Sequence, residues 1–276
     1  MTMDKLRELA AHFLEQDINR VTADNAVSQD LIGLRFYDAP LFGIADAEDP
    51  LFQTLREPGI MGQGVLLPKD VLPSAKRVIS WFLPFTKEVR SANGESMSEP
   101  SDSWRQARME GQDANIALGK AVCRALEAEG AVAIQVSGSG YFKMLAPFCS
   151  NWSERHVAYI AGLGTFGLSK GLITEKGIAG RFGSIVTDAE FPTTPRPYTT
   201  PFEYCIMCGA CAVNCPVDAI DPSKGVAAGK DHVACKTFCD FTEVMQRCGA
   251  GERKRYGCGK CQVNVPCEFR NPRDPA

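Results

Sequence analysis

The sequence lacks an excess of charge of either sign and lacks any long apolar run. Its 276 residues carry 30 Lys and Arg against 33 Asp and Glu, a formal net charge of -3. This balance provides no electrostatic attraction to a nucleic acid or to an anionic membrane, and we expect neither as a partner. No apolar run reaches the roughly 18 residues of a membrane span, and neither a signal peptide nor a twin-arginine segment opens the chain. We therefore expect a cytoplasmic protein.

Apolar patterns before residue 200 predict strands and helices in alternation. Runs rich in branched and aromatic residues predict buried strands at "RVISWFLPF" (77–85), at 131–137 and at 183–188. Residues 115–130 carry an apolar stripe at helical spacing and end on glycine, which predicts an amphipathic helix. With 45% hydrophobic residues the chain can bury a sizeable core. The alternation predicts a mixed α/β or α+β body.

Two segments are expected to be connections rather than core elements. Residues 86–113 are polar and rich in Ser, Glu and Gly, and we predict a surface loop or lid there. Residues 191–204 hold four prolines in fourteen residues, which favours a stiff extended linker. We place a domain boundary there, with a body at 1–195 and a second domain at 196–276.

Cysteine is distributed very unevenly along the chain. Ten of the twelve cysteines follow residue 204, and only Cys123 and Cys149 precede it. In a cytosolic protein such clustering indicates metal or redox chemistry rather than disulfides. The run "CIMCGACAVNCP" (205–216) has the spacing C-x2-C-x2-C-x3-C-P of bacterial ferredoxins with two 4Fe-4S clusters. The fourth cysteine of that pattern binds the other cluster, so a second set of cysteines must follow.

The segments "HVACKTFC" and "YGCGKCQVNVPCEF" supply the cysteines that complete two sets of ligands. We assign the first cluster to Cys205, Cys208, Cys211 and Cys267. We assign the second cluster to Cys215, Cys235, Cys258 and Cys261. Two thiols, Cys239 and Cys248, are left over, and Cys239 could replace Cys235. Structural zinc is the alternative, because C-x2-C pairs also form tetrahedral sites, but zinc does not call for a third cysteine three residues on or a fourth before proline.

The stretch "AGLGTFGLSKGLI" (161–173) contains the formal pattern G-x-G-x-x-G. A dinucleotide-binding turn must follow a strand and open a helix, but the preceding "SERHVAYIAG" predicts a helix with Ser153 as its N-cap. No acidic residue follows at a strand end about 20 residues on, as that turn also requires. We therefore expect the glycines to end a helix in a loop whose backbone approaches a large flat ligand.

With "LPSAKRVISWFLPF", "AGLGTFGLSKGLIT", "GSIVTD" and then the paired cysteine motifs, the chain resembles the epoxyqueuosine reductases and, more distantly, the reductive dehalogenases. The similarity runs in order from about residue 70 to residue 267. The resemblance implies a nitroreductase-like body that holds base-off cobalamin, and a ferredoxin-like module whose two 4Fe-4S clusters deliver electrons to make Co(I). It also implies that the glycine stretch contacts the corrinoid, through Gly162, Leu163, Gly164, Thr165, Phe166 and Gly167.

The chain departs from that family at the proton donor. The family has an Asp-Ser-Ala-Pro motif ahead of the glycine stretch, whereas residues 137–153 keep Ala146 and Pro147 but contain no carboxylate. Tyr141 and His156 are the catalytic candidates instead, because either could act as an acid if it faces the ligand. The family's helical-repeat region, which helps to hold tRNA, has no counterpart in these 276 residues, so we do not expect a tRNA substrate.

These features together predict an iron-sulfur, cobalamin-dependent oxidoreductase. We expect a ferredoxin or flavodoxin to supply electrons, which pass through two clusters to the corrinoid and reduce a small molecule. The alternative is an electron-transfer protein that reduces the cofactor of a partner redox protein and has no substrate of its own. A corrinoid carrier without turnover is a third hypothesis.

Overall fold

The body of the protein is built on an antiparallel sheet with the strand order β1-β2-β8-β3. The computed structural model describes residues 1–248, except the side chain of Cys248, and residues 251–274. The strands are β1 (Leu41–Asp46), β2 (Arg77–Pro84), β3 (Ala133–Ile134) and β8 (Gly180–Thr187). Strands β2 and β8 confirm the strands predicted at 77–85 and 183–188.

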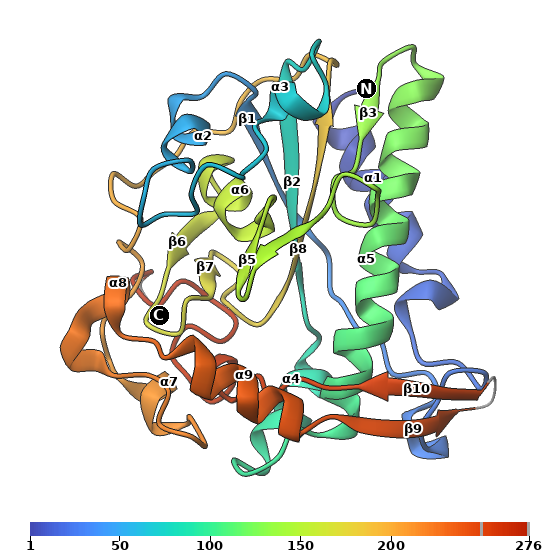
Figure 1. Ribbon diagram of the computed structural model, residues 1–276. Coiled ribbons are helices and arrows are strands. Elements are labelled where there is room, and N and C mark those ends of the chain that lie inside the picture. The colour runs from blue at the N-terminus through green and yellow to red at the C-terminus, as the bar shows by residue number, and fades with distance from the viewer. Residues whose placement is uncertain (249–250, 275–276) are drawn as a thin grey trace.

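Helices cover both faces of this sheet, which explains why its central strands are apolar on both sides. One face, with Ile79 and Trp81 of β2, packs against α1 and α5, and the opposite face, with Val78, packs against α6. Figure 1 shows the long helix α5 running beside the sheet. The fold is therefore mixed α/β. The helices of this part are α1 (Met3–Leu14), α2 (Pro50–Thr54), α3 (Pro68–Val71), α4 (Lys87–Gly94), α5 (Asp102–Ala128) and α6 (Glu154–Ile160).

The prediction of a surface loop or lid at residues 86–113 is wrong, because most of this segment is helical. It contains α4 and the first turns of α5. Several of its polar side chains are buried, among them Gln106 and Glu110. Arg255 Nη2 donates to Glu110 Oε1 at 2.6 Å, and both side chains are inaccessible or nearly so. Some polar residues of the segment therefore contact distant parts of the chain, Gln106 at Asn25 and Glu110 at Arg255.

The strand predicted at 131–137 is much shorter in the structure. Only Ala133–Ile134 pair with β8, and the chain turns at Gly138, where φ is 88°. Small hairpins then follow on either side of α6, and both lie near the cysteine-rich part of the chain. They are formed by β4 (Met144–Ala146) with β5 (Cys149–Ser150) and by β6 (Gly164–Phe166) with β7 (Leu172–Thr174).

The Pro-rich segment 191–204 contains neither helix nor strand, as predicted, but it is fastened to the body. Ile44 N donates to Thr194 Oγ1 at 3.0 Å, and the Tyr198 hydroxyl donates to the Tyr159 carbonyl at 2.5 Å. These contacts fix the direction in which the chain enters its cysteine-rich part. The division into two domains near this segment stays a prediction.

The cysteine-rich part folds into short elements that lie below the body in Figure 1. The hairpin of β9 and β10 extends from it, and β10 contacts α5. No helix in the described residues is long and apolar enough to cross a membrane. The elements of this part are α7 (Ala210–Val213), α8 (Gly225–Ala228), α9 (His232–Phe241), β9 (Val244–Cys248) and β10 (Gly251–Arg255).

Candidate iron-sulfur sites and the adjoining cavity

Four cysteines from two distant segments surround a small cavity of about 20 Å³. They are the set predicted for the first cluster: Cys205, Cys208, Cys211 and Cys267. Ile178 N, between β7 and β8, donates to the Cys267 carbonyl at 2.9 Å and so positions the predicted ligand from the far segment. Burial, and then the neighbouring thiolates of this set, raises the pKa of Cys267 to about 12. Four thiolates this close repel one another unless a cationic core lies between them, and an iron-sulfur cube supplies such a core.

Five cysteines line a second, larger cavity of about 530 Å³. Four are the predicted second-cluster ligands Cys215, Cys235, Cys258 and Cys261, and the fifth is Cys239, the alternative to Cys235. Cys235 and Cys239 lie one turn apart on α9 and therefore share a face of that helix. Both stay candidates for the fourth ligand. Among the residues that the structure describes, no three His, Cys, Asp or Glu side chains lie close enough to hold a single metal ion.

The loop that carries Cys258 is held against helices α4 and α5. Asn93 Nδ2, on α4, donates to the Cys258 carbonyl at 3.1 Å. Gly259 permits a close approach to α5, because a Cβ at this position would lie 2.0 Å from the ring of Trp104. The body of the protein therefore positions the loop that carries Cys258, a predicted second-cluster ligand.

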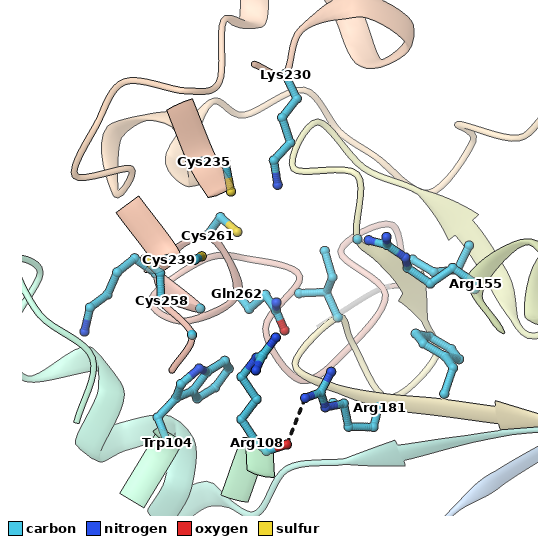
Figure 2. Close-up of a pocket in the computed structure, with 18 of the residues that line it drawn as sticks. Trp104, Arg108, Arg155, Arg181, Lys230, Cys235, Cys239, Cys258, Cys261 and Gln262 are labelled. Atoms are coloured by element: carbon cyan, nitrogen blue, oxygen red, sulfur yellow. Dashed lines mark hydrogen bonds between the residues drawn. The ribbon is translucent and has the colours of Figure 1, made fainter. Parts of the chain in front are cut away.

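The larger cavity lies between the cysteine-rich part and the body (Figure 2). Its apolar wall includes the aromatic rings of Trp104, Trp152, Phe182 and Phe238. Its polar wall includes the cations Arg108, Arg155, Arg181 and Lys230. A cavity of this size with apolar walls and a few convergent polar groups is typical of a cofactor or substrate site. A molecule bound here would lie beside the second set of cysteines.

Glu154, the first residue of α6, is the carboxylate that lines this cavity. Ser137 Oγ and Ser184 Oγ each donate to one of its carboxylate oxygens at 2.5 Å. Burial raises the pKa of Glu154 to about 7, although hydrogen bonds from the two serines partly offset the rise. Sequence reasoning missed this residue, because it follows directly after the segment 137–153 that was searched for an acid. The carboxyl group can hold a proton near neutral pH.

The catalytic candidates from the sequence, Tyr141 and His156, do not line the larger cavity. Tyr141 is 43% exposed. His156 Nδ1 shares a hydrogen bond with Ser153 Oγ at 2.8 Å. Burial, followed by the charges of Arg155 and Lys170, lowers the pKa of His156 to about 4, so its ring is neutral near pH 7. A catalytic role for either residue stays a prediction.

The glycine stretch 161–173 forms the end of α6 and the β6–β7 hairpin. A Cβ on Gly164 would lie 1.9 Å from the Ile173 carbonyl oxygen, and one on Gly162 would lie 2.9 Å from the Pro195 carbonyl oxygen. Both glycines are therefore required by the packing of the chain against itself, whether or not a ligand binds nearby.

Only the later part of that stretch reaches the larger cavity, through Gly171 and Leu172. The residues proposed to contact a corrinoid, 162–167, do not line it, and Gly167 lies at the small cavity instead. Corrinoid contact by 162–167 stays a prediction. The part of the glycine stretch best placed to contact a ligand therefore begins at Gly171.

The cysteine run matches a known sequence family. Residues 199–221 match the 4Fe-4S binding domain, which includes Cys205, Cys208, Cys211 and Cys215. The match covers one cysteine run and leaves the number of clusters unassigned. A comparison with curated proteins found no match.

Several solved structures resemble the chain at low sequence identity. The catabolic reductive dehalogenase NpRdhA is 13% identical with a TM-score of 0.56, and the match covers 96% of this chain and 36% of that one. An epoxyqueuosine reductase with an epoxyqueuosine-modified tRNA-Tyr stem loop is 19% identical with a TM-score of 0.50, over 96% and 64% of the two chains. Epoxyqueuosine reductase from Streptococcus thermophilus is 16% identical with a TM-score of 0.50, over 99% and 69%.

The chain thus spans about a third of the dehalogenase and less than two thirds of the tRNA-bound reductase. The similarity extends over nearly the whole of this chain and includes both the body and the cysteine-rich part. The resemblance seen in the sequence motifs is therefore confirmed at the level of the fold, which this chain shares with epoxyqueuosine reductases and a reductive dehalogenase.

Proposed function

We propose that the chain is an iron-sulfur reductase that passes electrons through two 4Fe-4S clusters to a corrinoid in the larger cavity, for reduction of a small molecule. One observation carries this proposal. The cysteines predicted to hold the second cluster line the same large cavity that the aromatic and cationic side chains enclose. A ligand in that cavity would be within direct reach of an electron carrier.

The two cysteine sets support two clusters with separate tasks. The first set includes Cys208, which is exposed, and the neighbouring Ile206 and Met207 are 41% and 43% exposed. Exposed apolar residues beside a cluster suit the brief docking of a ferredoxin or flavodoxin. The second set faces the cavity instead. Electrons would enter at the first cluster and leave from the second.

The walls of the larger cavity suit the binding of at least part of a large, flat cofactor such as a corrinoid. The volume of the cavity falls within the range of about 300 to 1,000 Å³ that is usual for cofactor sites. The walls offer flat aromatic surface at Trp104 and Phe182 and exposed backbone at Gly171 and Gly180. A bound corrinoid would supply the cobalt centre for reductive bond cleavage, and the protein would bind, orient and shield it. In this proposal residues 1–195 form a nitroreductase-like body and residues 196–276 a ferredoxin-like module.

Glu154 is the residue that we propose as proton donor. Reductive cleavage of a bond in a small molecule consumes two electrons and a proton, and the clusters can supply only the electrons. Glu154 lines the cavity, and Ser137 and Ser184 fix its carboxyl group in one orientation. In this proposal Glu154 takes the role of the aspartate in the family's Asp-Ser-Ala-Pro motif, since that aspartate has no counterpart in residues 137–153.

Anaerobic titration of the iron-loaded protein with cob(II)alamin tests this function. We expect the absorption and EPR spectra of base-off cobalamin to appear at one equivalent. Gln112 lines the cavity from α5, and Gln112→Trp should weaken binding by filling space without loss of iron. Lys120, exposed on the same helix, provides the control Lys120→Trp, which should bind as the parent does.

If the iron-loaded parent protein does not bind cob(II)alamin in the base-off form, the corrinoid proposal is contradicted. The result would then favour the alternative, an electron-transfer protein that reduces the cofactor of a partner. Equal loss of binding in the Gln112 and Lys120 variants would contradict the choice of cavity.

A further inference from the structure

Two arginines of the larger cavity, Arg108 on α5 and Arg181 on β8, lie together without a carboxylate partner. Arg181 Nη2 donates to the Arg108 carbonyl at 2.9 Å, which joins the helix to the strand (Figure 2). The Arg108 guanidinium lies 4.0 Å from the ring centroid of Tyr256, and its Nη1 donates to the Tyr256 carbonyl at 3.2 Å. Within the described residues, neither arginine forms an ion pair.

Two other cations of the cavity wall, Arg155 and Lys230, contact the loop between β6 and β7. Arg155 Nη1 donates to the Lys170 carbonyl at 2.7 Å, and Lys230 Nζ donates to the Ser169 carbonyl at 2.8 Å. These two cations therefore hold the cavity wall to that loop.

Arg181, in contrast, lies beside a second cation. Burial, and then the charge of Arg108, lowers the pKa of Arg181 to about 10, and only the hydroxyls of Tyr37 and Tyr256 oppose the fall. Within the described part of the chain, its buried Nε has no hydrogen-bond partner. Glu154 is already engaged by two serine hydroxyls. A pair of like charges with an unused donor costs free energy unless an anion occupies the space beside them.

We propose that Arg108 and Arg181 bind an oxyanion, a carboxylate or phosphate group of the small molecule that enters the cavity. Planar guanidinium groups bind both oxyanions with paired, charge-assisted hydrogen bonds. Held by this group, the rest of the molecule would extend into the cavity toward Cys258 and Cys261. The assignment of that molecule as substrate rests on the proposed function, whereas the oxyanion site itself does not.

Calorimetric titration of the iron-loaded, corrinoid-free protein with benzoate, benzamide and inorganic phosphate tests the site. We expect benzoate or phosphate to bind and the uncharged benzamide not to bind. Arg108→Gln and Arg181→Gln should each weaken anion binding about tenfold or more, since a charge-assisted hydrogen bond is of that size. Arg181→Lys should recover part of the loss. Arg7→Gln, an exposed arginine of α1, should bind as the parent does.

Iron content and thermal unfolding of each variant separate binding from folding. Should either glutamine variant lose iron, Arg108→Lys and Arg181→Lys decide the outcome, because a lysine keeps the charge but lacks the paired donors of a guanidinium and should still weaken anion binding. Equal binding of benzoate and benzamide, no binding of either anion, or unchanged binding in both arginine variants would overturn the proposal.

A phosphate carried by the cofactor is distinguished from a substrate anion by comparing cob(II)alamin with cobinamide, which lacks the phosphate-linked nucleotide. If the arginine variants lose cob(II)alamin but keep cobinamide and benzoate, the anion belongs to the cofactor and the substrate assignment is overturned. If no corrinoid binds but benzoate still requires both arginines, the proposed function fails and the oxyanion site stands.

Discussion

Lys260 Nζ donates to the Asn93 carbonyl at 2.6 Å, across 167 residues of sequence. The ammonium group is fully buried and also donates to the Ser96 carbonyl at 2.6 Å. Lys260 lies between Cys258 and Cys261, two ligands predicted for the second cluster. A single side chain therefore ties the second-cluster loop to the segment around α4.

Lys260→Met should destabilise the protein and reduce its iron. The substitution removes the donor to the Asn93 and Ser96 carbonyls and leaves the buried Asn93 carbonyl without this partner, which costs about 2 kcal/mol. Chemical unfolding under anaerobic conditions measures the change. Lys69→Met, at an exposed lysine paired with Glu48, should alter stability by less than about 0.5 kcal/mol. Similar effects of the two substitutions would show that the Lys260 contacts do not hold the loop.

Glu154 should make stability depend on pH in a defined direction. Its pKa is raised from 4.5 to about 7 in the folded protein, so the folded state binds the proton more tightly than the unfolded state. The free energy of unfolding should therefore fall as pH rises from about 4.5 to about 7, and then level off. In Glu154→Gln that part of the slope should vanish. An identical slope in parent and variant would contradict the raised pKa.

Gly164→Ala should lower stability and iron content together. The new Cβ would meet the Ile173 carbonyl oxygen at 1.9 Å, and the β6–β7 hairpin packs against the cysteine-rich part. Gly140, where a Cβ has open space around it, provides the control Gly140→Ala, which should keep parental stability. If Gly164→Ala retained parental stability but lost cobalamin binding, this glycine would serve the ligand rather than the packing.

Cys235→Ser and Cys239→Ser should differ, although both thiols face the larger cavity. We predict that Cys235→Ser removes the EPR signal of the second cluster and about half of the iron, whereas Cys239→Ser keeps both. Four ligands per cube leave room for only one of the two. The reverse outcome would make Cys239 the ligand.

The sequence predicted the features that are encoded by residues close together in the chain. The apolar run around Trp81 identified β2, and cysteine spacing identified the four-residue set that lines the small cavity. It did not predict the start of α5, because Gln106 and Glu110 are polar residues buried by contacts with distant segments. Those contacts exist only in the folded chain.

Two features of the candidate site were also beyond sequence reasoning. The raised pKa of Glu154 comes from burial beside Ser137 and Ser184, which lie on other segments. Cys235 and Cys239 share one helix face, so spacing alone cannot choose between them. In both cases the answer depends on how distant segments pack in the folded chain.

The metal content of the anaerobically purified protein tests the central claim, two iron-sulfur clusters of which one borders the large cavity. We predict about eight irons per chain, four for each cube, and no stoichiometric zinc. Cys215→Ser should then keep the reduced EPR signal of the cluster held by Cys205, Cys208 and Cys211. Stoichiometric zinc with negligible iron, or only about four irons in the fully loaded parent, would contradict the account.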